Sequence, residues 1–162
     1  WPSSAASDVY KRQIRNGAWD GFNEFDRERR RSEKMNKKTD TLTAFVYRRN
    51  WKICGIAFFV VGEYVKKKLE KYSLPRKTNL EDAWKFGPFY ITEDARGIGQ
   101  RWFREIILPY ARENNAPRIL INSAHARAFS FYERFWEEIG TYTSVSDDKK
   151  HHREGRIYLV TV

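Results

Sequence analysis

The residues with the clearest chemical potential lie between Phe89 and Arg101, in the segment FYITEDARGIGQR. An apolar stretch ends in a short acidic turn, a Gly-x-Gly pair at Gly97 and Gly99 follows, and an amphipathic helix is expected to begin there. Such a unit leaves backbone N–H groups free at the helix N-terminus, where glycines allow close approach and the helix dipole favours negative charge. Arg96 and Arg101 add cations. The segment therefore predicts a phosphate or pyrophosphate site, with a ligand-free glycine turn as the alternative.

Two familiar phosphate loops do not match this segment. The dinucleotide-binding fingerprint needs a third Gly or Ala three residues after Gly99, and that position is Trp102. A Walker A loop needs Gly-Lys-Ser/Thr after four intervening residues, which the segment lacks. An anion site at this loop therefore belongs to another class.

Two stretches, in the right order, resemble the GNAT superfamily of N-acetyltransferases. Gly97-Ile98-Gly99 is similar to the end of that family's acyl-CoA signature, Gln/Arg-x-x-Gly-x-Gly/Ala, at the start of its central helix. The stretch AFSFYERF at 128–135 resembles the family's Ala-x-x-Phe-Tyr-Glu, and EEIGTY at 137–142 resembles the strand entry that follows. The resemblance is tight over residues 86–142 and loose over 43–162.

The resemblance implies acetyl-CoA as co-substrate and a set of site residues. The CoA pyrophosphate would be bound at Arg96, Gly97, Ile98, Gly99, Gln100 and Arg101. The pantetheine would pair with the preceding strand, which would also orient the acetyl carbonyl, at Phe89, Tyr90 and Ile91. Tyr132 would be the general acid, because a phenol O–H stabilises the leaving thiolate; its alternative role is a core aromatic. The implied reaction is direct attack of a primary amine on the thioester, without a metal.

The sequence also departs from the family pattern. Asp94 stands where the signature opens with Gln or Arg, and an alignment that puts Arg96 there leaves the loop two residues short. The glycine expected after the Phe-Tyr-Glu stretch is missing, since Phe135 runs directly into Trp136. His125 replaces an asparagine common in the family. These departures indicate a divergent member or an incomplete reading frame.

Further candidates depend on residue type alone. Glu93, or Asp94, could accept the proton of the incoming amine, and both could equally be solvated turn residues. His125 is a candidate cofactor contact or a helix cap. His151 and His152 have no evident third ligand, so no metal site is predicted. Cys54, the one cysteine, alternates within an apolar strand and is expected to be buried filler.

Hydrophobic periodicity predicts the elements that position this segment. Helices are expected at 18–35, 99–114 and 124–138, and a short one within 64–82 that ends by Pro75. Strands are expected at 43–47, 53–61, 84–92, 118–123, 141–146 and 156–162. Pro109 should kink the second long helix or end its regular part. The order predicts an α/β fold with a mixed sheet, and the resemblance implies that it is GNAT-like, with a mostly antiparallel sheet flanked by helices.

The charge balance favours polyanionic partners without identifying one. The 162 residues carry a net charge of +10. A basic run at 27–38 is interspersed with acids, which is typical of a solvated helix, and a nucleic-acid-binding module is the alternative function. A catalytically inactive GNAT-like domain is a third interpretation. CoA is itself rich in phosphate, so nucleic acid is not needed to explain the charge. The expected partner is a small-molecule or peptide amine, and a homodimer stays open.

The N-terminal segment calls for separate treatment. Residues 3–13, SSAASDVYKRQ, resemble the in-frame translation of a sequencing adapter, so residues 1–13 are expected to be a non-native tail and 14–162 one domain that is truncated at its start. Without the tail the charge is +10 − 1 = +9. With one cysteine, no signal peptide and no apolar run of membrane length, a cytoplasmic protein off the membrane is expected.

Overall fold

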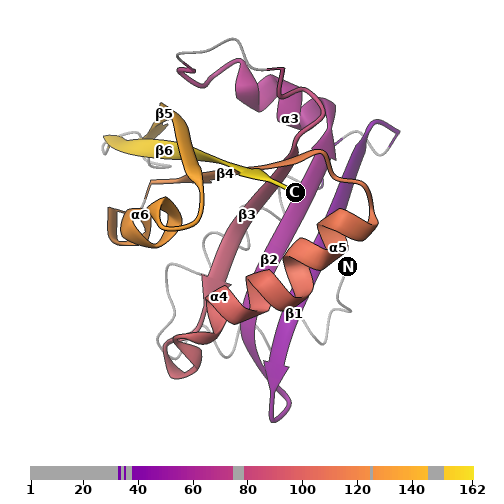
Figure 1. Ribbon diagram of the computed structural model, residues 1–162, viewed down its shortest axis with the longest axis vertical. Helices are drawn as coiled ribbons and strands as arrows, with labels where there is room; N and C mark the ends of the chain where they lie inside the picture. Colours follow the sequence, from indigo (N-terminus) through magenta and orange to yellow (C-terminus); the bar gives the residue numbers. More distant parts are fainter. Residues whose placement is uncertain (1–32, 34, 36–37, 75–78, 125, 146–151) are drawn as a thin grey trace.

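The computed structural model of the chain describes residues 33, 35, 38–74, 79–124, 126–145 and 152–162 (Figure 1). The predictions for the tail at 1–13 and, apart from two residues, for the helix at 18–35 lie outside these residues. Most of the basic run at 27–38 lies outside them as well.

The described elements follow the predicted order from the hairpin to the last strand. They are β1 (Asp40–Arg49), β2 (Lys52–Gly62), α3 (Glu63–Leu69), β3 (Trp84–Ile91), the 3₁₀ turn η1 (Glu93–Ala95), α4 (Ile98–Trp102), the π-helical turn η2 (Phe103–Ile107), α5 (Leu108–Glu113), β4 (Arg118–Ser123), α6 (Ala126–Glu133), β5 (Glu137–Val145) and β6 (His152–Thr161). The apolar run at 53–61 is the buried strand β2, as its composition predicts.

The six strands form one sheet in the order β1-β2-β3-β4-β6-β5. β3 and β4 are parallel, and the other four neighbouring pairs are antiparallel. This confirms the predicted α/β fold with a mixed, mostly antiparallel sheet flanked by helices. The parallel pair is joined through the helix at 98–113, which is the crossover that parallel strands need.

A β-bulge at Gly87–Pro88 divides β3 into two halves. Before the bulge Phe86 is opposite Phe59 of β2, and after it Phe89 is opposite Ala57, so β3 contains one extra residue. Since side chains alternate between the two faces, the extra residue puts Phe86 and Phe89 on the same face of the sheet. Their ring centroids lie 5.3 Å apart.

The same bulge marks the end of the contact between β3 and β4. Their register covers Trp84–Phe86 against Ile119–Ile121 and goes no further among the described residues. Pro88 has no N–H to donate to a neighbouring strand, which favours separation at this point. Figure 1 shows β4, β6 and β5 turning away from the three long strands β1–β3.

The helix predicted at 99–114 is present at 98–113 as α4, η2 and α5 in direct succession. Its regular α geometry is interrupted just before Pro109, and the Leu108 N–H donates to the Phe103 carbonyl, five residues back. A proline cannot supply the usual fourth-residue donor, and a π turn shifts the pairing by one residue. The same shift changes the apolar face: regular α-helical spacing would place Ile106 on it with Trp102 and Phe103, yet Ile106 is 55% exposed.

The helix predicted at 124–138 is shorter than its apolar spacing indicates. It ends at Glu133, and Glu137 already pairs with Leu159 in the sheet, so Ile139 belongs to β5. The polar loop predicted at 147–155 is shorter too, because Val145 and His152 are opposite each other across β5 and β6. Strand pairing overrides the helical periodicity of this stretch.

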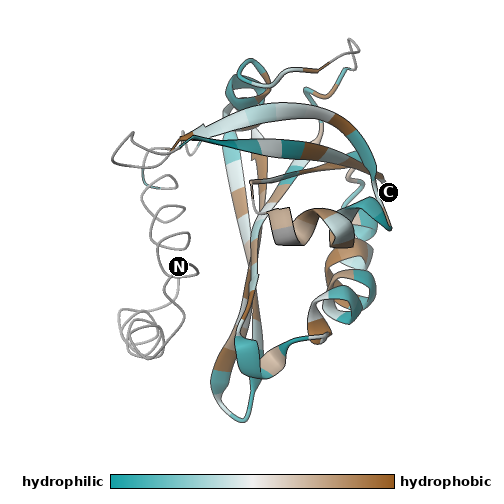
Figure 2. Cartoon of the chain, turned by 90° about the vertical axis from the view of Figure 1, so that its left-hand side faces the viewer, coloured by the Kyte–Doolittle hydropathy of each residue, from teal (hydrophilic) through white to brown (hydrophobic). Residues whose placement is uncertain are grey.

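One face of the sheet holds the main hydrophobic core. The 98–113 helix contributes Trp102, Phe103, Ile107 and Ala111, and α6 contributes Tyr132. Figure 2 shows both helices on the same side of the sheet. The 98–113 helix therefore packs on the second half of β3, where Trp102 and Gly99 contact Phe89, and α6 packs on β4 and β6.

Two neighbouring isoleucines test this helix placement. Ile107 is 0% exposed, so Ile107→Ala should lower the free energy of unfolding by about 2–5 kcal/mol, the cost of a core cavity. The same substitution at the exposed Ile106 should change it by less than about 0.5 kcal/mol. Urea unfolding of the two variants measures the difference. Equal losses would contradict the orientation of the helix.

Candidate functional site

The second half of β3 presents backbone groups to an edge that β4 does not pair. The Thr92 N–H donates to the Cys54 carbonyl at 2.9 Å. Because pairing direction alternates along an antiparallel strand, the peptide groups of Tyr90 face β2, and those of Phe89 and Ile91 face the opposite edge. Of the three residues predicted to contact pantetheine, two thus direct N–H and C=O groups to the open edge, and Tyr90 directs them into the sheet.

The local structure requires glycine at positions 97 and 99 for two different reasons. Gly97 has φ +92°, a left-handed conformation that side-chain-bearing residues rarely adopt, and nothing lies within 4 Å of where its Cβ would stand. Gly99 lies against β3: its Cβ would stand 3.3 Å from the Phe89 ring and 3.4 Å from Ile91. Gly97 therefore permits the turn, and Gly99 permits the close approach of helix to strand.

The helix start beyond Gly97 has free donors. The first backbone N–H groups of a helix have no partner within it, and Gly97 at the N-cap offers no side chain to accept from them. These are the amides of Ile98, Gly99 and Gln100, and they begin a helix that continues to Glu113. The structure thus brings the predicted pyrophosphate residues together at the end of the β3 strand.

The two loop arginines are exposed and paired locally. Arg96 contacts Glu93 at 3.3 Å, and Arg101 contacts Glu105 at 2.9 Å, one helical turn on. The Glu105 contact raises the pKa of Arg101, through its hydrogen bond first and its charge second. Exposed ion pairs of this kind contribute little to stability, so a phosphate can replace the glutamate beside either arginine at small cost.

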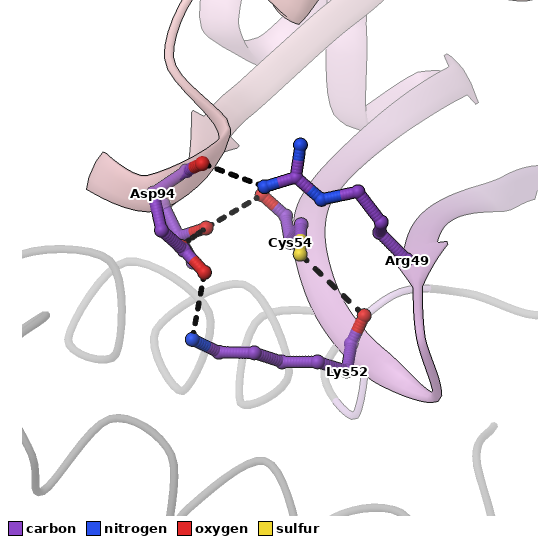
Figure 3. A network of polar contacts seen from close by, with 5 residues as sticks. Arg49, Lys52, Cys54 and Asp94 are labelled. Carbon is purple, nitrogen blue, oxygen red and sulfur yellow. Dashed lines mark hydrogen bonds and ion pairs between the residues drawn. The ribbon is translucent and has the colours of Figure 1, made fainter.

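Asp94 is tied to the β1–β2 hairpin, as Figure 3 shows. Lys52 Nζ lies 2.8 Å from its carboxylate, and Arg49 Nη2 donates to its backbone carbonyl at 2.6 Å. The Thr92 hydroxyl contacts the second carboxylate oxygen, at 2.5 Å, and the Cys54 carbonyl, at 3.3 Å. The acid that departs from the resembled signature is therefore paired with one cation, Lys52, from another part of the chain, and Arg49 binds its backbone carbonyl.

Arg49 and Lys52 were not predicted as site residues, and they lie between the strands expected at 43–47 and 53–61. Asn50 and Trp51 between them both have positive φ, so the reversal is a tight two-residue hairpin. Arg49 and Lys52 lie more than forty residues from Asp94 in the sequence. The sequence of a hairpin does not indicate which distant loop its tip will contact. The acidity of Asp94 beside a predicted anion site was the available hint that cations had to be near.

The two predicted catalytic side chains lie in contrasting surroundings. Glu93 is 84% exposed at the start of η1. Tyr132 is 8% exposed in α6, with its ring stacked on Trp136 at 5.0 Å and packed on Tyr158 at 5.4 Å. The burial of Tyr132 suits a core role and leaves its part in proton transfer a prediction. His125 lies outside the described residues.

The described residues contain neither a metal-binding cluster nor a helix that could span a membrane. Among the residues that the structure describes, no three His, Cys, Asp or Glu side chains gather as a metal site would require. No helix within the described ranges has the length and apolar character needed to cross a membrane.

The Asp94 network makes a prediction about pH. The hydrogen bond from Lys52, then that from Thr92, lowers the pKa of Asp94 to about 2. A carboxylate with a lowered pKa stabilises the fold above its ordinary value near 4, and this contribution is lost as pH falls toward 2. Carboxyl ¹³C titration should find Asp94 still ionised at pH 3, and Lys52→Met should raise its pKa toward the ordinary value. Titration of the unaltered protein near pH 4 would contradict the network.

Among the comparisons with known proteins, the solved structures bear on the fold. The sequence matches no protein-family model, and no curated protein matches it. Among solved structures, a "probable acetyltransferase" from Staphylococcus epidermidis is similar with a TM-score of 0.67 and 15% identity, over 98% of this chain and 94% of that one.

Two further solved structures are similar. The ribosomal-protein-alanine N-acetyltransferase of Brucella melitensis has a TM-score of 0.54 and 17% identity, over 85% of this chain and 78% of its own. A Salmonella typhimurium protein solved with its cofactor acetyl-CoA has a TM-score of 0.51 and 10% identity, over 75% of this chain and 65% of its own. The chain therefore has the fold of the GNAT N-acetyltransferases.

Proposed function

We propose that this chain is an N-acetyltransferase that moves an acetyl group from acetyl-CoA to a primary amine of a small molecule or peptide. The observation that carries the proposal is the succession, along one stretch of chain, of an open strand edge at Phe89 and Ile91 and an uncapped helix start at Ile98–Gln100. The fold supports it, since a similar structure was solved with acetyl-CoA. The proposed catalytic unit is residues 14–162, preceded by a non-native tail.

The proposed binding mode divides CoA between these two features. The pyrophosphate accepts hydrogen bonds from the amides that follow Gly97, where the helix dipole adds favourable charge. Arg96 and Arg101 lie beside those amides and contribute charge-assisted contacts. The amide groups of pantetheine pair with Phe89 and Ile91, extending the sheet as a further strand would. The thioester then lies toward the bulge, between β3 and β4.

The proposed chemistry is a single acyl transfer. The neutral amine nitrogen attacks the thioester carbonyl carbon, and a β3 backbone N–H stabilises the oxyanion that develops. The C–S bond then breaks, and the CoA thiolate takes a proton from the Tyr132 hydroxyl. The amine loses its proton to a carboxylate or to water. No protein thiol takes part, which agrees with the burial of Cys54.

The structure favours Glu93 over Asp94 as the carboxylate that accepts the amine proton. Asp94 has a pKa of about 2 and is held by Lys52 and Thr92, so it is a weak base. Glu93 is exposed, and its one described partner, Arg96, lies on the same turn. Glu93 thus stays the proposed base, directly or through a water molecule.

Acetyl-CoA binding tests the proposed site. Gly99→Glu should weaken binding by about tenfold or more, because the new side chain meets Phe89 and its carboxylate repels the pyrophosphate. Ile106→Glu is the matched control, since it adds the same charge to an exposed position of the same helix and should leave affinity unchanged. Isothermal titration calorimetry measures both. No saturable binding by the unaltered protein at millimolar acetyl-CoA would refute the proposal.

Tyr132→Phe tests the general acid. The ring contacts with Trp136 and Tyr158 are kept while the proton donor is lost, so the fold and the acetyl-CoA affinity should hold, which circular dichroism and calorimetry check. The rate of CoA thiol release over a panel of primary amines should fall on the order of 10²-fold. An unchanged rate would assign Tyr132 to the core alone. Binding without thiol release from any amine would indicate a GNAT-fold domain that no longer transfers acetyl groups.

A further inference from the structure

The glycine-rich loop carries an acid where a bound anion would be repelled. Asp94 precedes Gly97 by three residues, and a lone carboxylate there would oppose pyrophosphate binding. In this chain the charge is balanced by Lys52, and the adjoining carbonyl is occupied by Arg49 (Figure 3). The repulsion is therefore largely cancelled, which leaves the question of what Asp94 contributes.

Stability of the whole fold does not account for it. The Lys52 and Asp94 side chains are about half exposed, at 48% and 46%, and ion pairs exposed to this degree add little. What the contacts do is local. They join the tip of the β1–β2 hairpin to the 3₁₀ turn η1, from both the side chain and the backbone of one residue.

Few other contacts fix this turn. Two backbone bonds close it, from the Ala95 N–H to the Thr92 carbonyl at 3.0 Å and from the Arg96 N–H to the Glu93 carbonyl at 3.3 Å. Ala95 is buried beneath it. Both bonds are internal to the turn. Its direction relative to the sheet therefore depends on the burial of Ala95, on the Thr92 bonds to the Cys54 carbonyl, and on the contacts of Asp94 with the hairpin tip.

We propose that Asp94 is a positioning residue, which with Lys52 and Arg49 of the hairpin holds η1 so that the amides after Gly97 face the CoA pyrophosphate. This rests on the proposed function of the loop. The hairpin tip thus holds the loop through contacts that come from another part of the chain.

A positioning role and a purely electrostatic role of Asp94 predict opposite changes in CoA affinity for Asp94→Asn. If Asp94 acted through its charge alone, Asp94→Asn would remove a negative charge near an anion site and tighten CoA binding. If Asp94 positions the loop, the same change weakens CoA binding, because Lys52 loses its charged partner and η1 is left with the Arg49 bond to the residue-94 carbonyl as its link to the hairpin tip. The expected loss is about tenfold, the size of one charge-assisted hydrogen bond.

The experiment compares Asp94→Asn and Lys52→Met with Asp82→Asn. Asp82 is also an exposed aspartate in an ion pair, with Arg118 at 3.0 Å, so its variant controls for the loss of one such pair elsewhere. Calorimetry with CoA should give about tenfold weaker binding for the first two variants and unchanged binding for the control. Binding of pantetheine, which has no pyrophosphate, should be unaffected in all three and would be lost from a misfolded protein.

Amide hydrogen exchange without ligand separates this proposal from the proposed function. Exchange at residues 95–100 should be faster in Asp94→Asn and Lys52→Met, and that in β2 and α5 should not change. Unaltered exchange in the loop, or CoA binding that is equal or tighter in Asp94→Asn, would overturn the positioning role. If the unaltered protein fails to bind CoA while loop exchange responds as expected, the proposed function falls and the mechanical link between hairpin and loop stands.

Discussion

The extra residue at Gly87–Pro88 of β3 is the constraint on which the rest of the structure depends. It ends the pairing of β3 with β4, so the strand keeps one neighbour and gains an open edge. It also changes which side chains face the helices, so that Phe89 and Ile91 lie under Gly99. Without the bulge, the peptide groups of these two residues would have a neighbouring strand, and no edge would be left to pair with an extended ligand.

The helix that follows is fixed against this re-phased strand by aromatic packing. The Trp102 ring centroid lies 5.8 Å from that of Phe89 and 5.7 Å from that of Tyr47. The Phe103 and Phe86 ring centroids lie 5.2 Å apart. These contacts set where the helix begins, and Gly99 lets it approach the strand. The hairpin is connected to the same place twice, through Tyr47 in the core and through Asp94 at the surface. Strand edge, helix start and hairpin tip thus form one assembly.

Much of this arrangement could be predicted from the sequence because its signals are local. Alternating and helical patterns located the strands and the 98–113 helix, and the glycine spacing located the loop. The ends of helices and strands were less predictable where strand pairing competes with a helical spacing of apolar residues. Trp136 and Ile139 continue the helical spacing of α6, yet Glu137 onward pairs with β6. The π turn before Pro109 likewise moved Ile106 out of the core, which a fixed period of 3.6 cannot anticipate.

The candidate site was predictable in its type of ligand and less so in its supports. Gly97, Gly99 and the flanking arginines indicate an anion site by themselves. The partners of Asp94 could not be inferred, because a contact between a hairpin tip and a loop more than forty residues away depends on the finished sheet. The direction of each peptide group in Phe89–Ile91 depends on the bulge, and Gly-Pro within an apolar strand marks the place of a bulge without fixing the register.

The most direct test is an amide NMR titration of the ¹⁵N-labelled protein with CoA. The account predicts saturable shifts concentrated at Ile98, Gly99 and Gln100 and at Phe89 and Ile91, with smaller changes at Tyr90, whose peptide groups face β2. Shifts confined to surface lysines and arginines, or a response that does not saturate, would contradict the claim that the open β3 edge and the helix start form the cofactor site.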